Sequence, residues 1–346
     1  MQNPVALRFY NVSFVLLLCT CALLPLLFLP ATIGSFAAVK YTLLSLGVLL
    51  TGTTWIISQF VEGTMQFPRH RALLGLFIVA ALSFLSSLFS PNVPVSLWGN
   101  IFNFDSFSTI AILALFAFLV SLFAREQRRL VKLFLTMFFV SAGTVLLQII
   151  LFLLHKVPFV IKYFDHVASQ GTLVGTWVDF SFFTAFTFIL SILMIEVLAP
   201  KGLFRTLSLG GVVVSLLALV FLNFNTAWLF AVVSSLLVFV YKSSVERALI
   251  ARDQHAEEHS EYRQRFPAVS FISLLIGLFF LLAGSSLGGA ISRFSGLSFS
   301  DIRPSLSATL TIARPVLAKD PFFGGGPARF SELWDLHKSS EINKTV

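Results

Sequence analysis

Two histidines bracket a pair of acidic residues in one charged stretch of the sequence, His255-Ala256-Glu257-Glu258-His259. This spacing fits the H-x-x-E-H pattern, in which two histidines one helical turn apart hold a zinc ion and a glutamate acts as the base. No third ligand is evident nearby, and no domain would exclude water from such a site. We therefore interpret the stretch as a solvated, charged helix and predict neither a metal nor a cofactor.

Arginines near the C-terminus could bind phosphate, because a planar guanidinium pairs with phosphate oxygens through two parallel hydrogen bonds. Four of them follow the last long apolar segment, namely Arg293, Arg303, Arg314 and Arg329. A cluster just outside a membrane could grip the pyrophosphate of a lipid carrier, and Arg303, Arg314 and Arg329 are the candidates. The alternative is that each arginine anchors the chain to anionic lipid headgroups.

Two carboxylates lie in otherwise apolar segments, where an ionised group costs at least about 2.5–3.5 kcal/mol at the bilayer centre. Asp179 and Glu196 both lie near the ends of a segment. Solvation at the membrane interface explains both, and the alternative for Asp179 is a role in an outer cavity. The sequence lacks the series of central acidic residues that a proton-driven transporter needs, which disfavours a small-molecule transporter.

The composition indicates which scaffold must position these groups. Hydrophobic residues make up 57% of the 346 residues and charged residues 12%, against about 45–50% and about 25% in soluble domains. So few charges cannot cover a surface exposed to water. The two cysteines, Cys19 and Cys21, lie two residues apart in an apolar run, which excludes a disulfide scaffold. The sequence therefore predicts an all-α, polytopic integral membrane protein.

Nine apolar segments could cross a bilayer, whose hydrocarbon core of about 30 Å needs about 20 helical residues. They cover residues 11–29, 36–60, 72–89, 106–124, 132–154, 176–198, 204–222, 226–241 and 267–287. The eighth is short and reaches the required length only with the preceding residues and some tilt. We predict a transmembrane bundle over residues 1–287 and an extracytoplasmic tail over residues 288–346.

Basic residues are distributed unequally between alternate loops, and this asymmetry predicts the orientation of the chain. One side collects 14 of the 24 lysines and arginines: Arg8, Arg69, Arg71, Arg125, Arg128, Arg129, Lys132, Lys201, Arg205, Lys242, Arg247, Arg252, Arg263 and Arg265. The opposite short loops carry only Lys156 and Lys162. We therefore predict a cytoplasmic N-terminus and an outer tail, and we attribute the net charge of +8 to topology rather than to nucleic-acid binding.

The tail contains one predicted amphipathic helix. Asp301 is a suitable N-cap, and Pro304 falls in the first turn, where its missing N–H costs nothing. An apolar face follows, formed by Leu306, Leu310, Ile312, Val316 and Leu317. Asp320-Pro321 ends the helix. We expect the helix to lie along the outer surface of the membrane.

The tail also carries a more specific pattern. Its parts are Arg303-Pro304-Ser305, Leu310-Thr311-Ile312-Ala313, Asp320-Pro321-Phe322-Phe323-Gly324-Gly325-Gly326, Phe330 and Trp334. This pattern resembles the signature in the outer loop of the O-antigen ligase and polymerase superfamily. Two stretches that open apolar segments are similar to that family as well, Gly175-Thr176-Trp177 and residues 223–229.

The resemblance implies a metal-independent membrane glycosyltransferase of the bacterial cytoplasmic membrane. Such enzymes take a glycan from an undecaprenyl-pyrophosphate carrier at the outer face and join it to another sugar, without a nucleotide. Arg303 matches the first arginine of the signature and would stabilise the departing pyrophosphate. No catalytic residue is assigned.

The sequence departs from the family pattern in two respects. Asn225-Thr226 stands where the family usually has Ser-Arg, which removes one expected cation. Family members also continue through a further outer stretch and closing helices, so we expect this chain to be truncated relative to them and inactive in transfer by itself. The alternatives are a non-catalytic membrane partner in glycan export and a small-molecule transporter.

Overall fold

The computed structural model describes residues 3–27, 36–63, 65, 67–68, 70–99, 105–165, 171–252, 266–295 and 306–338. Every regular element in these ranges is a helix, as the sequence predicts. The helices are α1 (Pro4–Leu26), α2 (Phe36–Glu62), α3 (Arg71–Leu88), α4 (Val93–Trp98), α5 (Phe107–Phe123), α6 (Gln127–Leu153), α7 (Pro158–Asp165), α8 (Trp177–Leu193), the π-helix η2 (Met194–Leu198), α9 (Leu203–Leu222), α10 (Asn225–Arg252), α11 (Ala268–Ser295), α12 (Leu306–Lys319) and α13 (Phe330–His337).

Seven helices within the described ranges are long and apolar enough to cross a membrane: α1, α2, α3, α6, α8 with η2, α9 and α10. Helix α5 and the apolar part of α11, Ala268–Gly284, are shorter. The prediction of an all-helical protein with many membrane-length helices is confirmed. Each of the nine predicted segments coincides with a helix, and the number of nine crossings stays a prediction.

The helices form two compact units. Unit 1 comprises residues 1–136 and 301–346, unit 2 comprises residues 137–300, and the division falls inside α6. The sequence predicts a boundary between residues 287 and 288, where the last apolar segment meets the tail. Unit 1 groups the tail helices α12 and α13 with α1 to α5, and the division into a transmembrane bundle and an extracytoplasmic tail stays a prediction.

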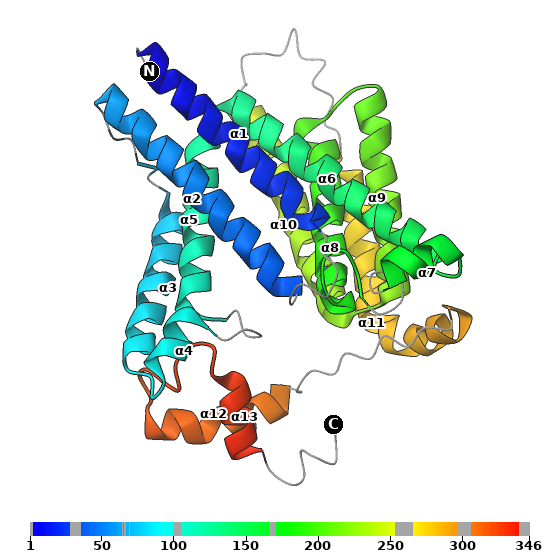
Figure 1. Ribbon diagram of the computed structural model, residues 1–346. Helices are drawn as coiled ribbons and strands as arrows, with labels where there is room; N and C mark the ends of the chain where they lie inside the picture. Colours follow the sequence, from blue (N-terminus) through cyan, green and yellow to red (C-terminus); the bar gives the residue numbers. More distant parts are fainter. Residues whose placement is uncertain are drawn as a thin grey trace. The chain divides into compact units, whose positions relative to one another are not determined.

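Within unit 1, α1 and α2 lie side by side (Figure 1). Gly47 allows the close approach, because a Cβ added there would lie 2.3 Å from Thr20 Oγ1. Hydroxyl groups also connect the two helices: Ser13 Oγ donates to the carbonyl of Thr51 at 2.8 Å, and Ser58 Oγ to that of Ala6 at 3.0 Å. Small residues and hydroxyls are typical of packed membrane helices, since bilayer lipid provides no hydrophobic force between them.

A buried arginine joins α1 to the start of α6. Arg129 pairs with Glu126 one turn earlier and donates from Nη2 to Asn11 Oδ1 at 2.9 Å. Its guanidinium carbon lies 4.2 Å from the centre of the Tyr10 ring, a cation–π geometry. One member of the predicted cytoplasmic cation cluster is therefore a packing residue rather than a free surface charge.

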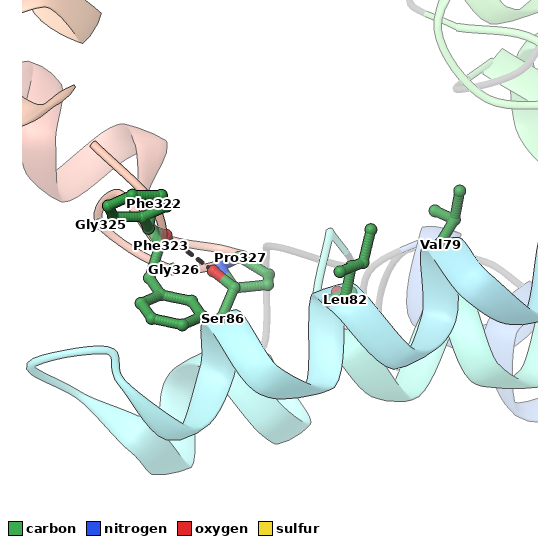
Figure 2. A pocket seen from close by; sticks show the side chains of 9 residues that line it. Val79, Leu82, Ser86, Phe322, Phe323, Gly325, Gly326 and Pro327 are labelled. Atoms are coloured by element: carbon green, nitrogen blue, oxygen red, sulfur yellow. Dashed lines mark hydrogen bonds between the residues drawn. The ribbon is translucent and has the colours of Figure 1, made fainter. Parts of the chain in front are cut away.

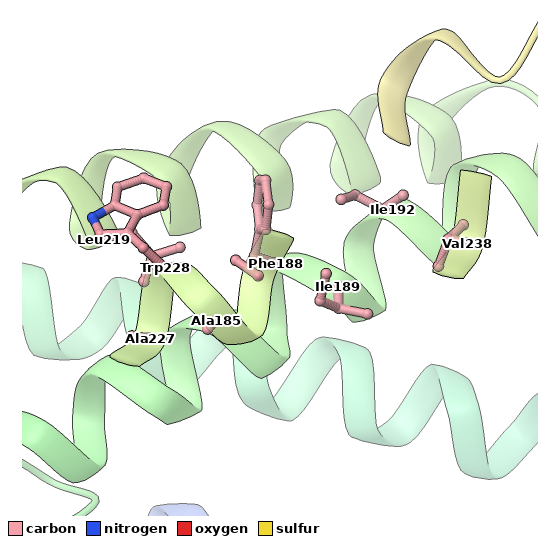
Figure 3. Packing of buried hydrophobic residues seen from close by; sticks show 9 residues of the cluster. Ala185, Phe188, Ile189, Ile192, Leu219, Ala227, Trp228 and Val238 are labelled. Atoms are coloured by element: carbon pink, nitrogen blue, oxygen red, sulfur yellow. The ribbon is translucent and has the colours of Figure 1, made fainter. Parts of the chain in front are cut away.

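The core of unit 2 is built around α8, which packs against α9 and α10 (Figure 3). Ala185, Phe188 and Ile192 of α8 share one buried cluster with Leu219 and Trp228. Alternating small and large side chains let the three helices interlock. The indole of Trp228 also stacks on the Phe280 ring of α11, with the ring centres 4.7 Å apart and the planes 6° from parallel.

The tail forms two short helices. Helix α12 begins at Leu306, runs through Pro315 and ends at Lys319, directly before the predicted terminator Asp320-Pro321. The predicted cap Asp301 and Pro304 lie outside the described residues. Helix α13 is not predicted from the sequence. The expectation that α12 lies on the membrane surface stays a prediction.

Candidate functional site

The glycine-rich part of the tail motif forms a compact turn after α12. Asp320 Oδ1 accepts a hydrogen bond from the Phe323 N–H at 3.1 Å, and the Asp320 carbonyl accepts one from the Gly324 N–H at 3.1 Å. Gly324 and Gly326 have φ angles of +60° and +86°, which glycine adopts without the Cβ strain of other residues. The Asp-Pro-x-x-Gly pattern is therefore a turn-forming sequence.

Helices α3 and α4 form a corner that holds this turn. Ser86 Oγ donates to the Phe323 carbonyl at 2.8 Å (Figure 2). Ser90 Oγ donates to the Gly325 carbonyl at 3.1 Å. The rings of Phe89 and Phe323 stack with their centres 4.3 Å apart. We call Ser86, Ser90 and Ser96 the serine corner. Both hydrogen bonds reach backbone carbonyls, so they fix the path of the turn.

Gly326 seats the turn directly on the serine corner. A Cβ at Gly326 would lie 2.6 Å from Ser90 Cβ and 2.7 Å from Ser96 Oγ. The two serines are themselves joined, since Ser96 Oγ donates to Ser90 Oγ at 2.7 Å. A side chain at this position would have to push the corner apart, so a glycine is required here by contact as well as by backbone angle.

The side chain of Arg329, a predicted pyrophosphate ligand, is already hydrogen-bonded to other groups of the tail. Its side chain is 6% exposed, and it donates from Nε at 2.9 Å and from Nη2 at 2.6 Å to the carboxylate of Glu332. Nη1 reaches the Gly325 carbonyl at 3.4 Å. The hydrogen bond and charge of Arg329 lower the pKa of Glu332. This geometry holds the glycine turn against the start of α13.

The other two arginine candidates for pyrophosphate binding are Arg314 and Arg303. Arg314 lies on α12 with an exposed side chain, so it can reach a ligand from that helix. Arg303 lies outside the described residues. Arg314 and Arg329 therefore both lie in the tail part of unit 1. Arg314 is exposed on α12, whereas Arg329 is buried and paired with Glu332.

Asp179 begins α8 in unit 2 as part of a capping box. Its Oδ2 accepts from the Thr176 N–H at 3.0 Å and from Thr176 Oγ1 at 2.7 Å. Thr176 Oγ1 in turn accepts from the Asp179 N–H at 3.2 Å. This reciprocal pattern satisfies two N–H groups that a helix start leaves unpaired. Capping accounts for this carboxylate near the end of an apolar segment, and a role in an outer cavity stays a prediction.

Glu196 is buried, although interfacial solvation is what the sequence predicts for it. Its side chain lies in the π-helix η2 and is 8% exposed. Oε1 accepts from the Ser270 N–H at 2.8 Å, which caps the first turn of α11 from a different helix. Oε2 is buried without a hydrogen-bond partner in the described ranges. Helix capping across helices gives no sequence pattern, so it could not be anticipated.

The turn between α9 and α10 contacts α11 closely. Asn223 has a φ of +49° and donates from Nδ2 to the Gly284 carbonyl at 2.8 Å, and its Oδ1 accepts from Trp228 Nε1 at 3.3 Å. A Cβ at Gly284 would lie 3.2 Å from Asn225 Oδ1. The second family-like stretch, residues 223–229, is therefore a structural joint between three helices.

Metal chemistry receives no support from side-chain clustering. No group of three or more potential ligands of the His, Cys, Asp or Glu type occurs in the part of the chain that the structure describes. The H-x-x-E-H stretch from His255 to His259 lies outside that part.

Comparisons of this chain with protein-family models, with curated proteins and with solved structures give no match.

Proposed function

We propose that this chain is a multi-pass protein of the bacterial cytoplasmic membrane that acts on lipid-linked glycans at the outer face, in the manner of O-antigen ligases and polymerases. The observation that carries the proposal is the tail motif: its Asp320–Gly326 segment forms a turn that is fixed by its backbone to the serine corner. A motif held in this way has a defined position relative to α3 and α4, and a defined position is what a binding site requires.

The proposed ligand is the pyrophosphate of an undecaprenyl carrier. In glycan transfer, an acceptor hydroxyl attacks the anomeric carbon and gives up its proton to a base, and the bond from that carbon to the pyrophosphate oxygen breaks. The leaving group takes the electron pair, and a neighbouring cation stabilises its charge. Arg303 and the exposed Arg314 are the proposed cations. The guanidinium of Arg329, the third candidate, is already paired with Glu332.

Binding of the carrier can be measured with the purified chain, undecaprenyl pyrophosphate and phosphatidylglycerol as separate ligands. Arg314→Lys and Arg303→Lys should each weaken pyrophosphate binding by about tenfold, because lysine cannot form the two-pronged contact. Binding to phosphatidylglycerol should change little. Lys319→Gln removes an exposed cation from the same helix and serves as the control. Equal small losses for both ligands would mean plain anchoring to lipid headgroups.

Glycan transfer is tested with an undecaprenyl-pyrophosphate glycan and a lipid or glycan acceptor. Release of undecaprenyl pyrophosphate coupled to product supports an enzyme. Carrier binding without release favours the second candidate, a non-catalytic partner in glycan export. Two ion pairs support that candidate, because they engage both acidic residues of α13 and so withdraw them from use as a base: Arg329 pairs with Glu332, and Lys338 pairs with Asp335 at 3.0 Å.

The proposed topology has nine crossings, a cytoplasmic N-terminus and α12 along the outer membrane surface. It rests on the 14 basic residues in alternate loops, which the positive-inside rule assigns to the cytoplasmic side. Single cysteines can be introduced into a chain whose Cys19 and Cys21 are replaced by alanine. In intact cells, Gln127→Cys and Ile250→Cys should resist an impermeant thiol reagent, whereas Val95→Cys and Ser340→Cys should react. Labelling at position 127 would reverse the orientation.

A further inference from the structure

Several helix ends of unit 1 meet where α3 begins. The Asn3 N–H, directly before α1, donates to the Glu62 carboxylate at the end of α2 at 3.3 Å. Arg125, between α5 and α6, donates from Nη2 to the carbonyl of Phe67, which precedes α3. Arg129 joins the start of α6 to α1. These contacts bring exposed cations to one end of the unit, which we call the basic end: Arg8, Arg71, Arg125, Arg128 and Lys132.

The acidic residues at the basic end are already engaged inside the chain. Glu126 pairs with Arg129, and Glu62 accepts the hydrogen bond from the Asn3 N–H. Within the described ranges, none of the exposed cations of the basic end forms an ion pair with a carboxylate. Like charges that gather without acidic partners repel one another and attract anions. The basic end therefore favours an anionic partner from outside the chain.

The basic end is separate from the docked tail. Helix α3 has 18 residues, and a rise of about 1.5 Å per residue places its two ends about 27 Å apart. The glycine turn docks at the C-terminal end of α3, through Ser86 and Ser90. The basic end lies at the start of the same helix (Figure 1). A partner of the basic end is therefore different from a partner of the glycine turn.

Exposed apolar side chains lie among the cations of the basic end. Leu7 precedes Arg8, and Leu74 follows Arg71 by one helical turn; both leucines are exposed. The ring of Phe67 is exposed as well. A soluble phosphate or a nucleic acid would leave these side chains in water. An anionic phospholipid offers phosphate to the cations and an acyl chain to the apolar side chains, and the aliphatic stems of arginine and lysine can lie along the same apolar surface.

We infer that the basic end binds anionic phospholipid, with the lipid phosphate paired to the exposed arginines and the lysine. Basic clusters beside membrane helices attract anionic lipid by about fivefold in affinity per Lys or Arg. Arg128 and Lys132 are the best residues for a test, because they lie one turn apart on α6 and their side chains have no hydrogen-bond partner among the described residues. The inference is independent of glycan transfer, since it uses no residue of the tail.

The test compares phosphatidylglycerol with phosphatidylcholine of the same acyl chains. Each lipid is titrated into the delipidated full chain in detergent, and the first lipid bound is measured by native mass spectrometry. The wild-type chain should prefer phosphatidylglycerol by about 25-fold or more, since at least two cations contribute about fivefold each. Arg128→Gln combined with Lys132→Gln should lower the preference by about tenfold or more. Arg128→Lys combined with Lys132→Arg keeps both charges and should retain the preference.

A matched variant removes two cations from unit 2. Lys201 and Arg205 are exposed and lie one turn apart at the start of α9. Lys201→Gln combined with Arg205→Gln changes the net charge equally and should leave the preference nearly unchanged. The inference is overturned if the wild-type chain shows no preference for phosphatidylglycerol, or if the two charge-removing variants lose it equally, which would mean that net charge alone attracts the lipid. Displacement of phosphatidylglycerol by an equal concentration of inorganic phosphate would assign the basic end to a soluble anion instead.

Discussion

Helices α3 and α8 are both apolar and of membrane length, but they use their hydroxyl groups differently. In the apolar window of α8 56% of the residues are buried, against 17% in that of α3. The buried hydroxyls of α8 all donate within their own helix, to carbonyls three or four residues earlier; they belong to Ser181, Thr184, Thr187 and Ser191. Ser86 of α3 instead donates to a residue 237 positions away.

The difference indicates two uses of the same chemical group. A hydroxyl that donates to a carbonyl of its own helix needs no other partner. Because it is also small, it lets neighbouring helices approach without specifying which segment packs there. Gly211 of α9, for example, lies so close that an added Cβ would be 2.7 Å from Ser191 Oγ. A hydroxyl that leaves its helix specifies one partner segment. Helix α8 therefore contributes packing, and the C-terminal end of α3 contributes recognition of the tail.

The largest effect should come from breaking the packing around α8. Trp228→Ala removes a side chain with 0% exposure, together with its stacking on Phe280, and should lower the free energy of unfolding by about 3 kcal/mol. Denaturant titration in mixed micelles measures the change. Leu229→Ala, the neighbouring position with 51% exposure, should cost much less. Similar losses for the two variants would contradict the assignment of α10 to the core.

Breaking the serine corner should have the next largest effect, confined to the tail. Gly326→Ala adds a Cβ at a φ of +86° against Ser90 and Ser96, and should cost about 1–3 kcal/mol of tail docking. Hydrogen exchange of residues 320–333 should rise while that of α8 stays unchanged. Gly75→Ala, with open space around it, is the matched control and should leave tail exchange as it is.

Removing one hydroxyl from α3 and one from α8 tests whether the two helices use their hydroxyl groups differently. Ser86→Ala should weaken tail docking by about 1 kcal/mol, because the Phe323 carbonyl loses its donor. Ser181→Ala removes a hydroxyl that bonds only within its helix, and should change the free energy of unfolding by less than about 0.5 kcal/mol. Hydrogen exchange at Gly324 measures the effect of Ser86→Ala, and denaturant titration measures the effect of Ser181→Ala. Equal effects would remove the distinction between the two helices.

The smallest expected effect concerns pH. Arg329 lowers the pKa of Glu332 in the folded tail, so this pair stabilises the tail above the unfolded pKa of about 4.3 and ceases to do so as the pH falls through the lower folded value. Because Glu332 is 49% exposed, solvent screening keeps the contribution small. Below pH 4 the protection of α13 amides against hydrogen exchange, relative to the intrinsic rate at each pH, should fall, and Glu332→Gln should remove this pH dependence. An unchanged pH profile in that variant would exclude the pair as its origin.

The membrane-length helices were predictable because apolar length alone defines them. Helix α8 begins one residue from the predicted start, and α12 ends at the predicted terminator. Helix α4 was not predictable, since six residues carry too little periodicity to be recognised. Docking of the tail on Ser86 joins residues 237 positions apart, and a single sequence gives no signal for such a pair.

The candidate site was predictable only in part. The turn after Asp320 follows from its glycines and proline, and the exposed Arg314 agrees with a helix that presents cations. The pairing of Arg329 with Glu332 could have been read from their spacing of three residues, which brings side chains together on a helix. A role in phosphate binding and a role in local pairing use the same guanidinium, so residue type alone could not distinguish them.

The bond between Glu196 and Ser270 has a consequence for the order in which the protein is made. The two residues are 74 positions apart, so Glu196 leaves the ribosome long before its donor exists. Until α11 arrives, a carboxylate at the end of α8 must be solvated by water or lipid headgroups, which favours a location near the bilayer edge during synthesis. Insertion of α11 then supplies the N–H group that allows Glu196 to be buried. The burial of Glu196 thus depends on a hydrogen bond that only α11 can donate. A chain interrupted before residue 270 would leave this carboxylate without its donor.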